Sequence, residues 1–342
     1  MNSLIEVKNL EVRFDLKEGT VHAVNGVTLD VGHNRSLGIV GESGCGKSIT
    51  AKAMMRILPS RAKIVRGTIH LASRNGGRPI DLTRYRANAK ELRAIRGSDI
   101  SMIFQEPMTS LSPVHTVGNQ IIETIRLHQK VNKKEARNRA IEMLRLVGVP
   151  LPKRRVDAYP HELSGGLRQR SMIAMALACH PRLLIADEPT TALDVTIQAQ
   201  ILALIARLRE EFGMSVIMIT HDLGVVAETT DEVAVMYLGL VVERGPVREI
   251  FNNPKHPYTI ALLESIPRIG KGNKERLASI KGSVPDPFST PPGCPFHPRC
   301  KYAIKGECTM GAPPVVRSID AHHTVACHLF TESGTVSEEP MD

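Results

Sequence analysis

Leu-Ser-Gly-Gly at residues 163–166 decides how the chain is interpreted, because it lies between two other nucleotide-site motifs in a fixed order. Upstream, residues 41–48 read Gly-Glu-Ser-Gly-Cys-Gly-Lys-Ser, the G-x-x-x-x-G-K-S pattern of a phosphate-binding loop, or P-loop. Downstream, an apolar run at residues 183–186 ends in Asp187 and Glu188. A P-loop alone indicates a bound nucleoside triphosphate. The intervening LSGG stretch indicates which class of protein uses that nucleotide.

Size and composition are those of a globular protein. The 342 residues can bury one large core, or one large and one small core. No apolar run approaches the ~18 residues that a membrane span requires. The first residues have neither the basic leader nor the long apolar core of a secretory signal. We therefore expect a protein that is made and kept in the cytosol.

The net charge of +9 permits attraction to nucleic acid or to an anionic membrane surface. Lysines and arginines are spread along the chain, and basic runs such as residues 153–155 are typical of a solvated surface. No aromatic residues are interleaved with them in the way that stacks bases. We therefore expect no nucleic acid partner.

The order of predicted elements gives the P-loop the context it needs. Residues 3–14 and 21–31 alternate apolar and polar positions, which predicts antiparallel strands. Residues 36–40 form a short apolar run that leads into the glycine loop, and residues 48–58 have helical spacing. Strand, glycine loop and helix follow one another, as the motif requires.

The rest of the chain predicts an inserted helical part, a parallel sheet and an extension. Residues 117–157 are helical and charge-rich. Beyond the LSGG stretch, helices and strands alternate, which implies parallel strands with crossover helices (helix 166–179, strand 183–186, helix 196–212, strand 216–219). Strands at 233–237 and 240–243 close the domain, and from about residue 251 the composition shifts to Pro, Gly, Cys and His. We expect an ATPase domain at 1–252 with a helical subdomain at about 117–178, an extension at 253–330 and a disordered tail at 331–342.

The P-loop supplies the chemistry of phosphate binding. Its glycines let successive backbone N–H groups converge on phosphate oxygens, and the next helix offers its positive N-terminus. Lys47 is expected to reach the β- and γ-phosphates, and Ser48 to hold Mg²⁺. The ATP-binding residues expected here are Gly41, Ser43, Gly44, Gly46, Lys47, Ser48 and Ile49.

Polar residues at the ends of other strands complete the expected catalytic site. Asp187 ends a buried strand, where its carboxylate can reach Mg²⁺ through water, and Glu188 is placed to deprotonate the attacking water. Gln105 follows the strand at residues 100–104 and can touch Mg²⁺ or that water. His221 follows the strand at 216–220 and can contact the γ-phosphate. Parallel sheets place ligands at these carboxyl ends.

With these motifs, the chain resembles the ATP-binding subunits of ABC transporters, and within them the oligopeptide/dipeptide/nickel importer ATPases. The general motifs cover roughly residues 4–245. The narrower resemblance depends on FQEPMTSLSP at 104–113, YPHE at 159–162 and HPYT at 256–259. It implies an α/β fold: a P-loop NTPase ABC ATPase domain with a RecA-like core, an antiparallel β-subdomain and an inserted α-helical subdomain, plus a small Cys-rich C-terminal extension.

The resemblance also assigns roles and partners. Phe14 would stack on adenine, although many relatives have tyrosine there; Ser164, Gly165 and Gly166 would contact the γ-phosphate of ATP held by the opposite subunit; Asp194 would link the two sites; and Gln105 with the segment after it would receive a coupling helix from a membrane subunit. The implied enzyme is an ATPase on the cytoplasmic face of the inner membrane. Its implied partners are a second, related ATPase subunit, two transmembrane permeases and, indirectly, an extracytoplasmic solute-binding protein.

Four cysteines crowd the extension, with the spacing Cys294-x5-Cys300-x7-Cys308-x18-Cys327. Four thiolates can hold Zn²⁺ or a [4Fe–4S] cluster. The lack of a C-x2-C pair weakens a zinc-ribbon interpretation, and nearby histidines keep mixed ligation possible (His297, His322, His323 and His328). Unligated cysteines are the third possibility. The resemblance favours a [4Fe–4S] cluster in a structural role, with Zn²⁺ as the alternative.

Functions other than peptide import are also compatible with parts of the sequence. The same kind of ATPase subunit could energise the import of nickel complexes or oligosaccharides, because the choice of cargo in such systems lies mainly in the binding protein and the permeases. A soluble ABC ATPase acting on nucleic acid or ribosomes usually carries coiled-coil insertions or two ATPase domains, whereas this chain has one P-loop and one LSGG stretch. A non-catalytic module is disfavoured by the presence of Lys47, Glu188 and His221.

Overall fold

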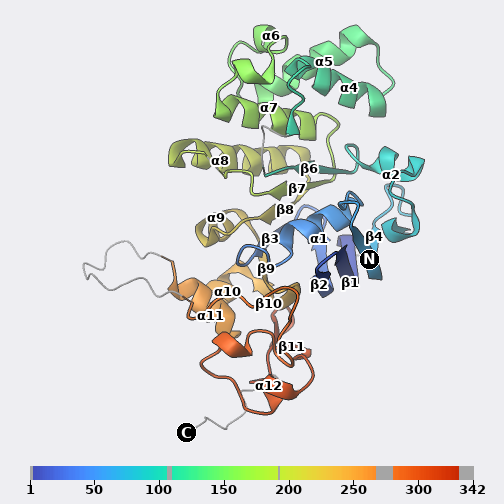
Figure 1. Cartoon of the computed structure of the whole chain (residues 1–342). Coiled ribbons are helices and arrows are strands. Elements are labelled where there is room, and N and C mark those ends of the chain that lie inside the picture. The colour runs from blue at the N-terminus through green and yellow to red at the C-terminus, as the bar shows by residue number, and fades with distance from the viewer. Residues whose placement is uncertain (1–2, 106–109, 192, 267–279, 331–342) are drawn as a thin grey trace, which may run out of the picture. The chain divides into compact units, whose positions relative to one another are not determined.

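The computed structural model describes residues 3–105, 110–191, 193–266 and 280–330 (Figure 1). The chain forms two compact units, each assembled from several stretches. The first unit comprises Met1–Ile5, Val31–Ser36 and Leu71–Ile219, and the second comprises Glu6–Asp30, Leu37–His70 and Thr220–Asp342. The expected coupling segment at 106–109 and the expected disordered tail at 331–342 lie outside the described residues.

Three parallel strands form the centre of the first unit: β6 (Ile100–Ile103), β7 (Leu183–Asp187) and β8 (Ser215–Ile219). β7 pairs with β6 on one side and with β8 on the other. Every residue of the three strands is buried. Continuous burial explains why these strands are apolar runs rather than alternating patterns. Because they are parallel, their carboxyl ends lie along one edge.

The first unit also contains several helices, of which α4 (Val117–His128), α5 (Lys133–Leu146) and α7 (Gly165–Leu177) gather into one group (green in Figure 1). The N-cap side chains of these three helices, Thr116, Asn132 and Ser164, each accept a backbone N–H from the first turn. The helices predicted after residue 117 are therefore present. The elements are β5 (Ile80–Asp81), α2 (Lys90–Ile95), α4 (Val117–His128), α5 (Lys133–Leu146), α6 (Pro152–Arg155), α7 (Gly165–Leu177) and α8 (Val195–Phe212).

The second unit contains a sheet in the order β3-β9-β10-β12-β11, in which β3 and β9 are parallel and the other pairs antiparallel. Its strands are β3 (Ser36–Val40), β9 (Glu232–Tyr237), β10 (Leu240–Pro246), β11 (Val316–Ser318) and β12 (Thr324–Ala326). Its helices are α1 (Lys47–Met54), α9 (Leu223–Thr229), α10 (Val247–Asn252), α11 (Pro257–Glu264) and α12 (Glu307–Met310).

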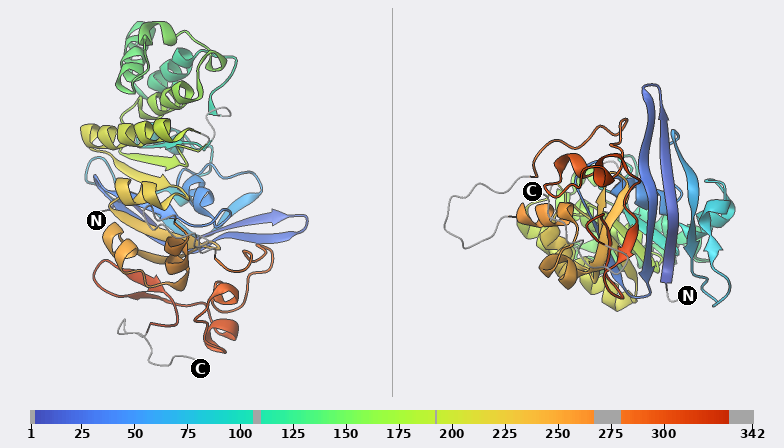
Figure 2. Two further views of the ribbon diagram at one scale, coloured as in Figure 1. Left: turned by 90° about the vertical axis from the view of Figure 1, so that its left-hand side faces the viewer. Right: turned by 90° about the horizontal axis from the view of Figure 1, so that it is seen from below.

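A long hairpin of two strands lies for the most part in the second unit. β1 (Ser3–Leu16) and β2 (Gly19–Gly32) lie side by side (blue in Figure 2), and β4 (Ala62–Leu71) follows β1 in the order β2-β1-β4. The two strands predicted from alternation are therefore confirmed and are slightly longer than expected.

The helix predicted over residues 48–58 is shorter than expected. α1 ends at Met54, because Arg56 adopts a φ of 56°, in the left-handed region, which an α-helix cannot contain. Pro59 follows soon afterwards and disfavours helical backbone before it.

Glu243 on β10 connects this strand to two later parts of the chain. Its side chain is buried, and its carboxylate accepts the backbone N–H groups of Lys255 (2.7 Å) and His256 (2.9 Å). The ring Nε2 of His323 lies 2.8 Å from the same carboxylate. Together with the pairing of Glu243 with Val325, these bonds fix the C-terminal strands to β10. The composition of the extension does not predict this pairing.

None of the helices in the described part of the chain combines the length and apolar character that a bilayer span requires.

Candidate functional site

The glycines of the P-loop have conformations that other residues rarely adopt. Gly41, Gly44 and Gly46 have φ values of 151°, 80° and 99°. A Cβ on Gly41 would lie 2.2 Å from the backbone oxygen of Met236, and a Cβ on Gly46 would lie 2.2 Å from that of Ala23. The loop therefore needs glycine at both positions, for its conformation and for its close packing.

Lys47 lies at the start of α1, directly after this loop. Its side chain is buried, and Nζ donates hydrogen bonds to the backbone oxygens of Gly41 (2.7 Å) and Glu42 (3.0 Å). The first turn of α1 contains no acidic residue, while Ser48 and Ile49 are half-buried in it. A lysine ammonium and the positive end of a helix thus meet at one loop, which is an arrangement suited to phosphate.

The segment that carries His221 lies beside the strand leading into the P-loop. The backbone N–H of Thr220 donates to the oxygen of Ile39 on β3 at 3.3 Å, two residues before Gly41. His221 is exposed. This placement is compatible with the expected contact between His221 and a γ-phosphate, which stays a prediction.

In the first unit, the ends of β6 and β7 bring Gln105 and Glu188 together. The Nε2 of Gln105 donates to Oε2 of Glu188 at 3.0 Å, and the hydroxyl of Thr191 donates to the same oxygen at 2.8 Å. Asp187, the last residue of β7, is buried. A half-buried carboxylate oriented by an amide and a hydroxyl is suited to receive a proton from water.

The backbone of Glu188 has an uncommon conformation. Its φ is 47°, in the left-handed region, which costs a residue with a side chain about 1–2 kcal/mol. Its N–H donates to the oxygen of Ile219 at the end of β8, at 2.8 Å. Such strain is found where a function requires a particular direction of the side chain.

The LSGG stretch forms the start of α7. Ser164 is the N-cap, and its hydroxyl accepts the N–H of Leu167 at 3.4 Å. The first turn has no acidic residue, Gly165 is exposed, and a Cβ on Gly166 would lie 3.2 Å from the Ile197 side chain. A helix N-terminus that is positive and open to solvent can take a second phosphate ligand.

Two residues that sequence reasoning missed support Glu188. One is Thr191, described above. The other is Gln169 on α7, which is 2% exposed and donates from Nε2 to the backbone oxygen of Pro189, the residue after Glu188. The sequence shows a glutamine shortly after the LSGG stretch, but neither its burial nor its partner could be identified from it.

The remaining expected site residues are placed as follows. Asp194 is the N-cap of α8 and accepts the N–H of Ile197 at 3.0 Å, so the structure gives it a local role. Phe14 is half-buried on β1. The adenine contact of Phe14, the link across a dimer at Asp194 and the Mg²⁺ ligands Ser48, Gln105 and Asp187 stay predictions. Hydroxyl, amide and carboxylate oxygens are ligands that fit Mg²⁺.

The four C-terminal cysteines all line one small pocket of about 10 Å³, with His256 and His328 among its other lining residues. Burial raises the pKa of the Cys294 thiol to about 11 and that of Cys327 to about 12. Within the described ranges, no three His, Cys, Asp or Glu side chains are arranged to hold one metal ion. The placement therefore does not match a single-ion site, and the space is that of about one water molecule.

Two histidines that line this pocket each have a buried ring nitrogen without a hydrogen-bond partner among the described residues. Nδ1 of His256 accepts the N–H of Tyr258 at 3.0 Å, and burial lowers the His256 pKa to about 4, so the neutral ring carries its proton on Nε2. That buried Nε2 has no partner among the described residues, and neither has Nε2 of His328. Both nitrogens belong to residues that line the pocket with the four cysteines, and neither makes a hydrogen bond to a cysteine sulfur.

Comparison with known proteins identifies both parts of the chain. Residues 24–191 match the family profile "ABC transporter", and residues 242–308 match "Oligopeptide/dipeptide transporter, C-terminal region". A probable peptide ABC transporter ATP-binding protein of Sinorhizobium fredii is 51% identical over 330 residues, covering 96% of this chain and 96% of the relative. A dipeptide transport ATP-binding protein of Bacillus subtilis is 50% identical over 330 residues, covering 96% of this chain and 95% of the relative.

Solved structures give the same result for the fold. The chain is similar to a dimeric, post-hydrolysis ATP-binding cassette bound to ADP and Pi, with a TM-score of 0.62 and 28% identity, covering 71% of this chain and 99% of that one. A component of an ABC transporter complex from Clostridium perfringens gives a TM-score of 0.60 and 29% identity, covering 74% and 92%. With a glycine-built P-loop, a supported carboxylate after β7 and relatives about half identical over nearly their whole length, the chain belongs to the ABC transporter family of ATP-binding proteins.

Proposed function

We propose that this chain is the ATP-binding and ATP-hydrolysing subunit of an importer for dipeptides or oligopeptides. As a member of the ABC family it is an ATPase. The observation that most directly supports a peptide cargo is the match of residues 242–308 to the C-terminal region of oligopeptide/dipeptide transporters. Relatives about half identical to it are named for peptide transport.

The hydrolytic step that we propose uses the P-loop and the residues at the ends of β6 and β7. Lys47 and the P-loop N–H groups hold the phosphates of ATP. Glu188 takes a proton from the attacking water as the water oxygen bonds to the γ-phosphorus and the bond to the β,γ-bridging oxygen breaks, releasing ADP and phosphate. Gln105 and Thr191 keep the Glu188 carboxylate oriented during this transfer. Mg²⁺, held by Ser48, Gln105 and Asp187, would neutralise phosphate charge when bound.

The same proposal includes a second ATPase subunit that shares each bound ATP with this chain. Ser164, Gly165 and Gly166 at the start of α7 would contact the γ-phosphate on a second ATPase subunit, and that subunit is a related chain rather than a copy. Two positive helix ends would then share one polyphosphate, so that hydrolysis reopens the pair. Two permeases, and through them an extracytoplasmic binding protein, complete the importer. The chain would act at the cytoplasmic face of the inner membrane.

Uptake of a labelled peptide tests this function. Cells that lack the chain should not accumulate a radiolabelled dipeptide or oligopeptide, and the wild-type gene should restore uptake while Glu188→Gln should not. Copurification of permeases from detergent-solubilised membranes should accompany this result. Normal peptide uptake in cells without the chain, together with a defect in nickel or oligosaccharide uptake, would identify a different cargo.

We further propose that Cys294, Cys300, Cys308 and Cys327 hold a structural [4Fe–4S] cluster, with Zn²⁺ as the alternative. A cluster binds each thiolate through a different iron, so its ligands surround a space instead of meeting at one point. The lining of one pocket by all four cysteines supports this choice. Iron, sulfide and visible absorption in anaerobically purified protein are expected. Colourless protein with stoichiometric zinc would contradict it.

A further inference from the structure

Glu42, the second residue of the P-loop, is bound by two side chains from the C-terminal part of the chain. Nη1 and Nη2 of Arg299 donate to Oε2 and Oε1 of Glu42 at 2.6 and 2.9 Å. The backbone N–H of Glu42 donates to the hydroxyl of Tyr258 at 2.9 Å. Both the side chain and the backbone of one P-loop residue are therefore held from more than 200 residues away in the sequence.

The ion pair is shielded from water. The Arg299 side chain is 3% exposed and that of Glu42 is 25% exposed. The guanidinium carbon of Arg299 lies 5.9 Å from the centroid of the Tyr237 ring, and Nε donates to the oxygen of Lys281 at 3.2 Å. A bidentate pair with a buried guanidinium and a part-buried carboxylate has a more fixed geometry than an exposed pair.

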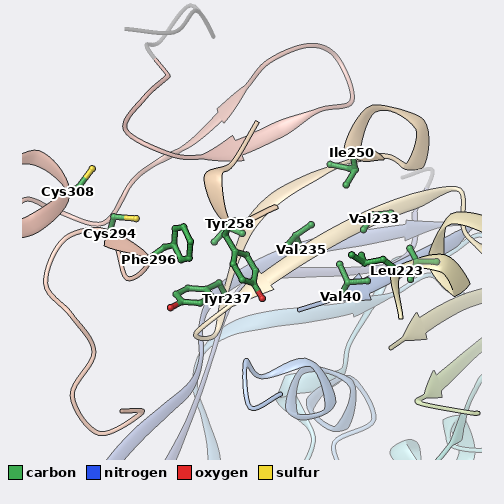
Figure 3. Close-up of a cluster of buried hydrophobic side chains, with 12 residues drawn as sticks. Val40, Leu223, Val233, Val235, Tyr237, Ile250, Tyr258, Cys294, Phe296 and Cys308 are labelled. Atoms are coloured by element: carbon green, nitrogen blue, oxygen red, sulfur yellow. The ribbon is translucent and has the colours of Figure 1, made fainter. Parts of the chain in front are cut away.

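Aromatic side chains hold the two donors in place. The rings of Tyr237, Tyr258 and Phe296 pack against one another, with centroids 4.7, 5.3 and 5.4 Å apart (Figure 3). Tyr237 belongs to β9, Tyr258 to α11 and Phe296 to the turn before Arg299. The cluster therefore connects the sheet of the second unit to the segment that carries Arg299.

The position of Glu42 in turn affects the lysine of the P-loop. The backbone oxygen of Glu42 accepts hydrogen bonds from Nζ of Lys47 at 3.0 Å and from the N–H of Cys45 at 3.3 Å. A shift of Glu42 would therefore move the partners of the ammonium group that is expected to bind phosphate. Arg299 and Tyr258 bind the P-loop at this residue.

Arg299 lies on a turn bounded by two of the four cysteines. The N–H of His297 donates to the oxygen of Cys294 at 2.9 Å, the N–H of Arg299 to that of Phe296 at 3.0 Å, and the N–H of Cys300 to that of His297 at 3.2 Å. Figure 3 shows Cys294, Phe296, Tyr258 and Tyr237 as neighbours along this path. A change in how Cys294 or Cys300 is held would move the turn and Arg299 with it.

We infer that Arg299 and Tyr258 are positioning residues for the P-loop, through which the cysteine-bearing turn sets the affinity of the loop for nucleotide. The inference depends on nucleotide binding at the P-loop and not on the cargo. It makes the extension a regulator of the ATP site in its own chain.

Nucleotide affinity of the purified full-length protein tests the inference. Fluorescent ATP would be titrated onto Arg299→Gln, Arg299→Lys, Tyr258→Phe and the matched control Lys305→Gln, which removes an exposed cation of the same region. Loss of a charge-assisted hydrogen bond predicts about tenfold weaker binding for Arg299→Gln, and loss of a neutral one about threefold weaker binding for Tyr258→Phe. The ATP affinity of Arg299→Lys should lie between that of Arg299→Gln and that of the wild type. Lysine keeps the positive charge but cannot form the bidentate pair.

Two further measurements separate positioning from a merely structural role. Cys300→Ser should weaken ATP binding in the wild-type background but should add nothing in the Arg299→Gln background, because both changes act along one path. If Arg299→Gln does not fold, the ATP affinity of Tyr258→Phe, which deletes one oxygen, tests the inference instead. Nucleotide affinities within twofold of the wild type in every folded variant, with only the thermal unfolding midpoint lowered, would overturn the inference. Peptide uptake plays no part in this test, so its outcome is independent of the proposed cargo.

Discussion

The P-loop and the end of β7 both place a charged side chain at a tight backbone turn, yet by opposite means. In the P-loop, the uncommon φ values belong to glycines, so the residues themselves supply the conformation of the loop. At the end of β7, the uncommon φ belongs to Glu188, and hydrogen bonds from Gln105, Thr191 and its own N–H hold it there. The backbone conformation of the P-loop depends on its glycines, whereas that of Glu188 depends on hydrogen bonds with other residues.

Replacing Glu188 separates the two regions most clearly. Glu188→Gln removes the proton acceptor while the P-loop is unchanged, so ATP hydrolysis should fall by about 10²–10⁴-fold with ATP binding retained. Release of phosphate and equilibrium binding of ATP would measure the two properties. The exposed Glu211→Gln on α8 is the control. Hydrolysis like that of the wild type in Glu188→Gln would remove this residue from the role of base.

Substitution of a P-loop glycine should weaken the binding of ATP, which Glu188→Gln leaves unchanged. In Gly46→Ala the Cβ would meet the Ala23 oxygen at 2.2 Å in a left-handed conformation. Strain of about 1–2 kcal/mol plus overpacking of about 1–3 kcal/mol predicts at least about 10-fold weaker ATP binding. Gly44→Ala is a matched control, because Gly44 also has positive φ but a Cβ there meets nothing within 4 Å. Equal losses in the two variants would show that packing at Gly46 is unimportant.

Removal of the Gln169 side chain should affect the end of β7 with Glu188 and leave the P-loop unchanged. Gln169→Ala leaves the buried oxygen of Pro189 without this donor, which costs about 1–3 kcal/mol and allows Glu188 to move. We expect about tenfold slower hydrolysis at saturating ATP and little change in ATP affinity. The exposed Asn119→Ala on α4 serves as the control for a lost helical amide. A fall in affinity without a fall in maximal rate would contradict this assignment.

The smallest effect is expected at Thr191. Thr191→Val deletes the hydroxyl that lies 2.8 Å from Glu188 Oε2, and because the residue is exposed, water can replace part of the bond. A loss of about 0.5–1 kcal/mol predicts a two- to fivefold slower maximal rate. Thr191→Ser keeps the hydroxyl and should behave like the wild type. If Ser and Val variants are equally slow, the methyl group rather than the hydroxyl matters.

The same contrast explains which parts of the molecule could be predicted. The P-loop, the buried parallel strands and the acidic end of β7 are local patterns, and the structure contains each of them. Gln105 and Glu188 were each expected at the end of a parallel strand, but the hydrogen bond between them was not predicted. The bond of Gln169 to Pro189 and the ion pair of Arg299 with Glu42 across 257 positions depend on packing between distant segments, for which a single sequence carries no periodic signal. Thr191 lies three positions after Glu188, and the turn that brings its hydroxyl to the carboxylate has no periodic signal either.

The buried carboxylate of Glu243 has a consequence for anyone who shortens this chain. It is satisfied by the start of α11 and by His323, far along the extension. A truncation that keeps β10 but stops before His323 would strip this carboxylate of its imidazole partner and expose the edge of β10 that β12 covers. A minimal ATPase fragment cut at the end of the nucleotide-binding motifs would thus tend to aggregate, and the extension should be retained when the protein is produced for biochemical work.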